Sequence, residues 1–323
     1  MSDSVFLDSI QPLFQDINAR FTGQSDFSPQ AAWDELVQSG FLRLLLPESA
    51  EGAGLDIAQA LPVLMSAGYW ALPLPYVETT LLYAALPAAL VDAPADTIEG
   101  NLALAVGTCG PGGPAQPLRQ GLHWLRALVT AKDGGIAVVP VSGDVEQGWR
   151  SQGEVKPLSQ ELDIHLLGTA AECLQLAGAM QRVLELTVDY ANTRQQFGRP
   201  IGKYQALQQQ ISVMTGHCHS AVMAAQLLAA GMVQADSGLR LDTPRIASAC
   251  GVIKAACQPV VATAHAVHGA IGVTEEYTLH HYTRRLLAGR IAGGSESCWF
   301  EQVGRACLEQ DGRVFDFTLA ALS

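Results

Sequence analysis

The stretch YANTRQQFGRPIGKYQ, residues 190–205, is the part of the sequence that says most about the fold. A long apolar run with helical periodicity precedes it, a glycine and a proline interrupt it, and a second helical run follows. The sequence therefore predicts a helix that ends near Arg194, a turn, and a new helix that begins near Tyr204.

The side chains of this stretch allow two interpretations. Arg194 places a planar, permanently charged guanidinium at a helix end, which suits a phosphate or pyrophosphate. Phe197 offers a flat apolar face, and Gln196 and Gln205 offer amide donors and acceptors, so the set could hold a dinucleotide. Alternatively, the stretch is a structural corner in which Phe197 fills the core and Arg194 caps helix carbonyls. On the residues alone, both interpretations stay open.

Outward from this stretch, the periodicity divides the chain into three regions. Residues 1–95 are predicted to form an N-terminal helical domain, in which Ser28 and Pro29 are typical of a helix start and Gly40 of a helix end. Residues 96–165 hold short, partly β-branched runs between glycine and proline turns, which predict a reduced β domain with few strands.

Residues 166–323 are helical again and small or apolar on several sides, which predicts a C-terminal four-helix bundle. The expected helices cover residues 168–193, 206–234, 244–267 and 294–308. The fold class is therefore mainly α with a small β domain.

Composition narrows the range of partners. Of the 323 residues, 49% are hydrophobic and only 15% are charged, which indicates a large core and surface covered by another subunit. The net charge of −12 argues against nucleic acid or an anionic membrane as partner. An anionic ligand such as a coenzyme A thioester would need a local basic patch.

No secretory signal and no membrane span are expected, and we expect a cytoplasmic protein. The seven cysteines contain no C-x-x-C pair and fit buried free thiols. The triplet His217-Cys218-His219 is not interpreted as a metal site, because residues i and i+2 of a helix do not face each other. We therefore predict no metal.

The pattern R-x-Q-F-G-x-P-I-x-x-x-Q over residues 194–205 closely resembles the signature of the acyl-CoA dehydrogenases. Residues 46–54 resemble the family's P-E-x-x-G-G-x-G loop, with Ala53 at one glycine. Residues 267–277 resemble its Q-x-x-G-G-x-G-x-x-x-E-Y region. The resemblance covers most of the chain and implies the family fold: a helical domain, a middle β domain and a C-terminal four-helix bundle.

The resemblance implies FAD as the cofactor, with the bundle of one subunit holding the adenosine end of the other subunit's FAD. The matching positions are Arg194, Gln196, Phe197, Ile201 and Gln205 of the first motif and Gly269 and Gly272 of the second. Two positions depart from the family: Ala266 replaces a glutamine and Ala270 replaces a glycine. His268 matches a histidine common at that place, and a satisfied core histidine is at least as good an interpretation.

The family's reaction removes a proton beside a thioester carbonyl while a hydride leaves the β carbon for the flavin, and a glutamate is the base. By the resemblance, the two usual base positions fall on Gly293 and Gly168, which cannot accept a proton. Glu296 and Glu172 lie one helical turn beyond them and are weak candidates for a displaced base. Glu296 is equally well explained as an acid that stabilises a helix N-terminus.

A further departure concerns the β domain, where residues 106–113 keep little of the family's T-E-P-x-A-G-S-D segment. Together with Gly293 and Gly168 at the two usual base positions, this departure predicts a helper subunit. Such a subunit resembles the non-catalytic chain of heteromeric bacterial members of the family. Residues 279–286 also resemble that type.

The alternatives are a self-sufficient homo-oligomer with a displaced base, another flavin activity on the same fold, and a non-enzymatic scaffold. The implied substrate is an acyl-CoA, which places the protein in lipid metabolism, and the implied electron acceptor is the electron-transfer flavoprotein.

Overall fold

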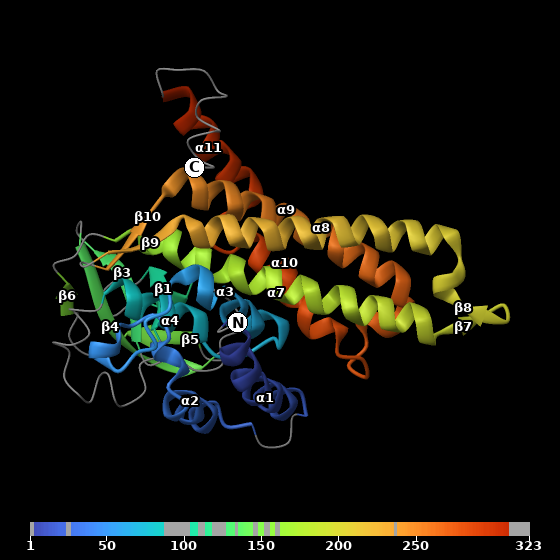
Figure 1. Cartoon of the computed structure of the whole chain (residues 1–323), viewed down its shortest axis with the longest axis horizontal. Helices are drawn as coiled ribbons and strands as arrows, with labels where there is room; N and C mark the ends of the chain where they lie inside the picture. Colours follow the sequence, from blue (N-terminus) through green and yellow to red (C-terminus); the bar gives the residue numbers. More distant parts are fainter. Residues whose placement is uncertain are drawn as a thin grey trace.

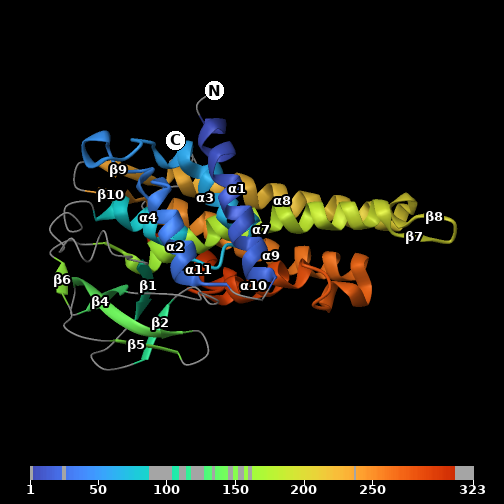
Figure 2. The same ribbon diagram turned by 90° about the horizontal axis from the view of Figure 1, so that it is seen from below.

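The structure, a computed structural model, describes residues 3–23, 27–86, 162–235 and 238–309, together with strand segments between residues 104 and 158. Figures 1 and 2 show an elongated molecule built around long parallel and antiparallel helices. The β sheet lies at one end, and a small hairpin marks the other.

The N-terminal region is helical, as predicted. Its elements are α1 (Asp3–Thr22), α2 (Pro29–Gln38), the short 3₁₀ turns η1 (Phe41–Arg43) and η2 (Glu48–Ala50), α3 (Ile57–Tyr69) and α4 (Tyr76–Ala85). The predicted start of α2 is confirmed, because the Ser28 side chain accepts a hydrogen bond from the Ala31 amide at 3.3 Å and Pro29 is the first helical residue. Gly40 follows the helix in the left-handed conformation.

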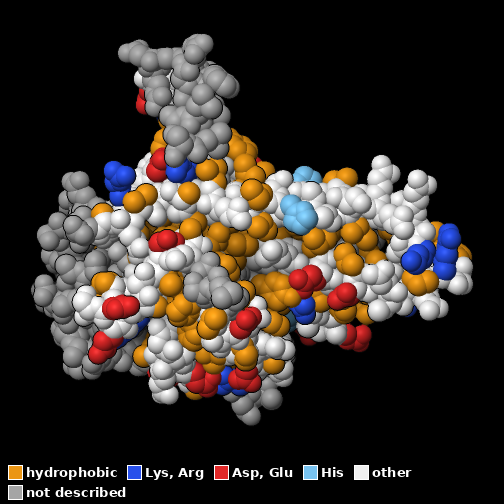
Figure 3. All heavy atoms as spheres, viewed as in Figure 1, with side chains coloured by type: hydrophobic (Ala, Val, Ile, Leu, Met, Phe, Trp, Pro, Cys, Tyr) orange, Lys and Arg blue, Asp and Glu red, His pale blue; other side chains and the backbone are white. Residues whose placement is uncertain are grey.

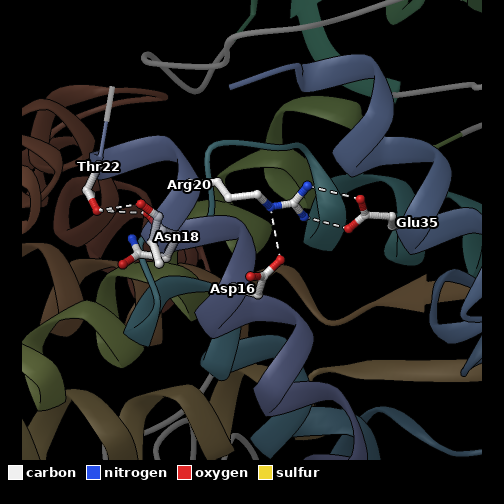
Figure 4. A network of polar contacts seen from close by, with 6 residues as sticks. Asp16, Asn18, Arg20, Thr22 and Glu35 are labelled. Atoms are coloured by element: carbon white, nitrogen blue, oxygen red, sulfur yellow. Dashed lines mark hydrogen bonds and ion pairs between the residues drawn. The ribbon is translucent and has the colours of Figure 1, made fainter. Parts of the chain in front are cut away.

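An ion-pair network joins α1 to α2 (Figure 4). The two terminal nitrogens of Arg20 donate to the two carboxylate oxygens of Glu35 at 3.0 and 2.5 Å. The Nε atom of the same guanidinium lies 2.9 Å from a carboxylate oxygen of Asp16. A bidentate pair fixes direction as well as distance, so this contact ties α2 to α1 in one orientation.

The β domain is built from a small number of mostly short strands, as predicted. The strands are β1 (Leu104–Thr108), β2 (Pro114–Pro117), β3 (Ala127–Lys132), β4 (Gly135–Asp144), β5 (Gly148–Ser151) and β6 (Lys156–Leu158). Because β3 pairs with both β1 and β4, strands β3, β1, β2, β5 and β4 close into a ring, and β6 extends from β4. The predicted minor share of β structure is confirmed. The positions of the shorter strands were not predicted, since strands of three to five residues show little hydrophobic periodicity.

The C-terminal region contains α7 (Ile164–Thr193), α8 (Gln205–Ala230), α9 (Thr243–His268), α10 (Leu279–Ile291) and α11 (Glu296–Glu309). Between them lie the hairpins β7–β8 (Gln195–Gln196, Arg199–Pro200) and β9–β10 (Met232–Ala235, Gly238–Leu241), and the turns η3 (Ile201–Lys203) and η4 (Gly269–Val273). Helices α7 to α10 form the bundle, and α11 packs on α9 and projects from it (Figure 1).

The bundle differs from the sequence-based prediction in two details. Helix α10 was not predicted, and it takes the place in the bundle that residues 294–308 were expected to fill. Its sequence hides it, because Thr278 gives no side-chain cap and the helix holds two histidines and three arginines among its 13 residues. Helix α8 also ends four residues early, since residues 232–235 pair with 238–241.

The run Thr243–Val273 is apolar and long enough to pass a composition test for a membrane span. Its most apolar window is 61% buried inside the protein. Helix α9 contacts α7, α8, α10 and α11, so its apolar character is that of a core helix.

The helical domain and the bundle meet where α3 crosses α7. A Cβ atom on Gly68 would lie 1.8 Å from the Gln175 carbonyl oxygen, and one on Gly178 would lie 1.9 Å from the Met65 carbonyl oxygen. The two backbones touch at this crossing, and each glycine makes room for the other helix.

Gly178→Ala should therefore destabilise the chain by about 3 kcal/mol, because the added methyl group overlaps backbone atoms that cannot move independently. Gly216→Ala, on a part of α8 with nothing within 4 Å of the new atom, should instead stabilise by about 1 kcal/mol. Urea unfolding followed by circular dichroism compares the two. Equal stability of both variants would show that the helices do not cross in backbone contact.

Candidate functional site

The predicted turn after Arg194 is a β-hairpin. Strand β7 pairs with β8 through Gln195 with Pro200 and Gln196 with Arg199. The two loop residues, Phe197 and Gly198, have φ angles of 52° and 80°. Two successive left-handed residues are what a tight two-residue hairpin requires, and the hairpin stands at the far end of the bundle from the β sheet (Figures 1 and 2).

The hairpin contradicts the structural-corner interpretation. The Phe197 side chain is 91% exposed at the tip, so it does not fill the core. Within the described part of the chain, the Arg194 guanidinium makes no hydrogen bond to a helix carbonyl, although its backbone amide donates to Tyr190. Ile201 takes the core position instead, packed with Ala191.

The structure brings the two predicted cofactor motifs to the same end of the bundle. Ile201, from the first motif, packs in one small apolar cluster with Val267, the first residue of the second motif. Tyr190 stacks on His268 with ring centroids 4.5 Å apart. Arg194, Gln196 and Gln205 are exposed at this end.

The two glycines of the second motif differ in their surroundings. Gly269 is exposed, has a φ of 65° and has nothing within 4 Å of the point where a Cβ would lie, so its backbone is open to a ligand. Gly272 is buried, and a Cβ there would lie 2.9 Å from the His268 Cβ. Packing inside the chain is enough to explain Gly272.

His268 is a core residue. Its side chain is 3% exposed, and its Nδ1 lies 2.8 Å from the Ala264 carbonyl oxygen. Burial lowers the pKa of the imidazole. These contacts place His268 in the core, with its Nδ1 bonded to the backbone.

Positive charge gathers at the hairpin although the chain is acidic overall. Arg194, Arg199 and Lys203 are all exposed here, and Figure 3 shows basic side chains at this end of the molecule. Against a net charge of −12, such a group of cations is a local site for an anion. The exposed Phe197 adds an apolar face to the same site.

The two positions expected for a base also lie together, at the other end of α7. A Cβ on Gly293 would lie 2.4 Å from the Oγ1 atom of Thr169, the residue after Gly168. The Thr169 hydroxyl also lies 3.4 Å from the Gly293 carbonyl oxygen. The space into which a side chain at position 293 would project is therefore filled from α7.

A buried lysine fixes the same loop from α9. The Lys254 side chain is fully buried, and its ammonium donates to the carbonyl oxygens of Gly289 at 2.7 Å and Ala292 at 2.6 Å. These carbonyls end α10 and have no helical partners of their own. The loop that follows α10 is thus held by α7 on one side and by α9 on the other.

Neither Glu296 nor Glu172 has surroundings that suit a general base. Glu296 forms a bidentate ion pair with Arg290, at 3.2 and 2.5 Å, and this hydrogen bonding lowers the pKa of its carboxyl. A lowered pKa makes a carboxylate a weaker proton acceptor. Glu172 is 3% exposed, and its Oε1 lies 2.4 Å from where a Cβ of Gly289 would be, so α10 covers it.

Two further predictions concern other segments. Residues 109–113, which hold most of the reduced T-E-P-x-A-G-S-D segment, lie outside the described residues. Cys218 is buried, and burial raises the pKa of its thiol to about 12, which opposes the thiolate that a metal ligand needs. In the described ranges, no group of three His, Cys, Asp or Glu residues could hold a metal ion.

Known proteins are similar to this chain in sequence and in architecture. Residues 167–308 match the family model described as acyl-CoA dehydrogenase, C-terminal domain. Acyl-CoA dehydrogenase IpdE2 of Mycobacterium tuberculosis is 28% identical over 268 residues, which cover 77% of each chain.

Two solved structures share the fold. The ChsE4-ChsE5 complex from Mycobacterium tuberculosis matches with a TM-score of 0.69 and 21% identity, over 95% of this chain and 98% of that one. PigA with FAD and proline matches with a TM-score of 0.69 and 16% identity, over 94% of this chain and 97% of that one.

The bundle, the β ring and the exposed hairpin together define a protein with the acyl-CoA dehydrogenase fold. The chain is thus similar to the acyl-CoA dehydrogenases, a family of oxidoreductases, in its C-terminal domain and in its fold. The predicted fold class and family resemblance are confirmed.

Sequence reasoning missed the residues that close the base region. Thr169 lies beside Gly168 in sequence, and Lys254 is a single cation in the otherwise uncharged run of residues 246–264, so a signal was present in both cases. Neither signal says which loop these side chains contact, because that depends on how α10 returns to α7 and α9.

The Glu296–Arg290 pair makes a pH-dependent prediction. Because the folded-state pKa of Glu296 lies below the ordinary value of 4.5, its contribution to stability is present above that pH and lost as the pH falls through the folded-state pKa. Glu296→Gln should thus lower the melting temperature at pH 7, and the difference from the parent should shrink as the pH falls below 4.5.

Thermal unfolding from pH 7 to pH 3 measures this difference. The matched control is Glu301→Gln, which removes an exposed pair with Arg305 and should change the melting temperature less at pH 7. A Glu296→Gln effect that persists unchanged at pH 3 would contradict the ion-pair assignment.

Proposed function

We propose that this chain is the helper subunit of a two-chain acyl-CoA dehydrogenase. Its hairpin binds the adenosine-pyrophosphate end of an FAD whose flavin lies in an unlike subunit, and that subunit supplies the base. The observation that carries the proposal is the closed base position: Gly293 has no side chain, and Thr169 occupies the space where one would project.

The distance between the two sites supports action in trans. Thr169, beside the base position, and Thr193, at the hairpin, lie on the same straight helix. They are about 36 Å apart, because an α-helix rises about 1.5 Å per residue. The hairpin therefore faces a cofactor held by another chain and does not reach this chain's own base region.

The exposed residues fit FAD by their chemistry. Arg194, Arg199 and Lys203 offer charge-assisted donors for a pyrophosphate, and Phe197 offers a flat face for an adenine ring. FAD, when bound, supplies the hydride acceptor. The hairpin residues bind and orient its nucleotide end, and they take no part in proton transfer.

Known relatives support the same proposal. PigA, with the same fold, binds FAD, and ChsE4 and ChsE5 form a complex of two differently named chains. An acyl-CoA as substrate, the electron-transfer flavoprotein as acceptor and a cytoplasmic location belong to the proposal. A self-sufficient dehydrogenase is the main alternative, and Glu172 and Glu296 are the acids it would have to use.

Arg194→Ala tests the cofactor contact. A charge-assisted hydrogen bond is worth about 1.5–3 kcal/mol, so FAD affinity of the assembled two-chain protein should fall roughly tenfold to a hundredfold. Flavin released during dialysis measures the loss, and Arg305→Ala, on the exposed face of α11, is the matched control. Unchanged flavin retention in Arg194→Ala would count against the contact.

Glu172→Gln and Glu296→Gln test the location of the base. Removal of a positioned general base costs about 10²–10⁴ in rate, whereas in a helper subunit both substitutions should leave turnover of the complex within a few-fold. The chain alone should be colourless and inactive, and activity should appear with a companion chain that has a full flavin motif and a glutamate base. A yellow homo-oligomer that reduces its flavin on addition of an acyl-CoA would overturn the proposal.

A further inference from the structure

Tyr204 stands at the N-cap of α8 but does not cap the helix. Its side chain makes no hydrogen bond to the first turn, where Ser, Thr, Asp or Asn would be the usual residue. The side chain lies against the hairpin instead. Its hydroxyl donates to the Gln196 carbonyl oxygen at 3.1 Å.

The Tyr204 ring contacts both sides of the hairpin tip. The Arg199 guanidinium carbon lies 4.2 Å from the ring centroid, in a cation–π contact. The Phe197 ring meets it edge-on, with centroids 6.4 Å apart. In the described structure, the hydrogen bond and the ring contacts that reach residues 196–199 from outside the hairpin all come from Tyr204.

The hairpin tip needs a stabilising contact of the kind that Tyr204 makes. Each of its strands is two residues long, and a short two-stranded hairpin is marginal in water. Phe197 also holds a left-handed conformation that a residue with a Cβ adopts rarely. Ile201 anchors the root of the hairpin, with its amide 2.8 Å from the Arg194 carbonyl oxygen, but it does not reach the tip.

We propose that Tyr204 is a positioning residue for the FAD site, and that it holds Arg199 as a second cation beside Arg194. A guanidinium over an aromatic ring keeps its in-plane N–H donors available for an anion. The hairpin is then presented to the partner's cofactor already ordered, so less entropy is lost on binding. This inference rests on the proposed function, and its anionic ligand is the pyrophosphate of the dinucleotide.

Two substitutions separate the hydroxyl from the ring. Tyr204→Phe removes one hydrogen bond and should weaken FAD binding to the assembled protein about twofold to tenfold. Tyr204→Leu also removes the cation–π contact and should weaken it by a further twofold to fivefold or so. Phe300→Leu, which changes a half-exposed ring on α11, should leave FAD affinity unchanged.

A second measurement uses the lone chain without cofactor. Trypsin cleaves after Arg194 and Lys203, whereas Pro200 blocks cleavage after Arg199. A released hairpin should be cleaved several-fold faster in Tyr204→Leu than in the parent. Cleavage after the exposed Arg305 in α11 is the internal reference. Tyr204→Phe should be cleaved at an intermediate rate.

The outcomes separate this inference from the proposed function. Faster flavin loss and faster hairpin cleavage in Tyr204→Leu than in the parent support the positioning role of Tyr204. A lower melting temperature with unchanged FAD affinity and unchanged cleavage overturns it, because Tyr204 would then be structural only. If Arg194→Ala weakens FAD binding and Tyr204→Leu does not, this inference alone fails. If Arg194→Ala has no effect on flavin retention, the proposed function fails first.

Discussion

The backbone contact between α3 and α7 is the constraint on which the rest of the molecule depends. Gly68 and Gly178 allow two helices to touch where any side chain would hold them apart. The contact places the helical domain against one half of α7 and leaves the other half to extend beyond it. One helix thus carries a buried end, at Thr169, and an end at Thr193 that leads into an exposed hairpin.

Under the proposed function, the buried end of α7 is a base position that has become part of the core. Gly293 is more than a missing glutamate, because its backbone has a φ of 67° and its missing side chain is replaced in space by Thr169. Lys254 satisfies the last carbonyls of α10 from inside the core, and Arg290 holds Glu296. A side chain at position 293 would overlap the Thr169 side chain and would sit on a left-handed backbone, so restoring one residue does not by itself restore a base.

Local sequence signals predicted more of the fold than of the candidate site. The helix start at Ser28, the helix end at Arg194 and the order of helical and strand regions follow from caps, turns and periodicity, which are properties of neighbouring residues. Helix α10 and the short strands were missed because tertiary contacts stabilise them where propensity is weak. The Glu296–Arg290 pair joins two elements across a loop, and no spacing rule predicts its geometry.

The motif residues divide into two groups when the fold is taken into account. Ile201, Gly272 and His268 are buried, and contacts within the chain explain them. Arg194, Phe197 and Gly269 are exposed, and nothing within the described chain explains them. Phe197 is the clearest case, since a left-handed aromatic residue that is 91% exposed costs stability twice, through its backbone and through its exposed apolar surface. Because Phe197 weakens its own chain in this way, we explain it by contact with a molecule outside the chain. Its position beside Arg194, Arg199 and Lys203 indicates that this molecule is an aromatic anion.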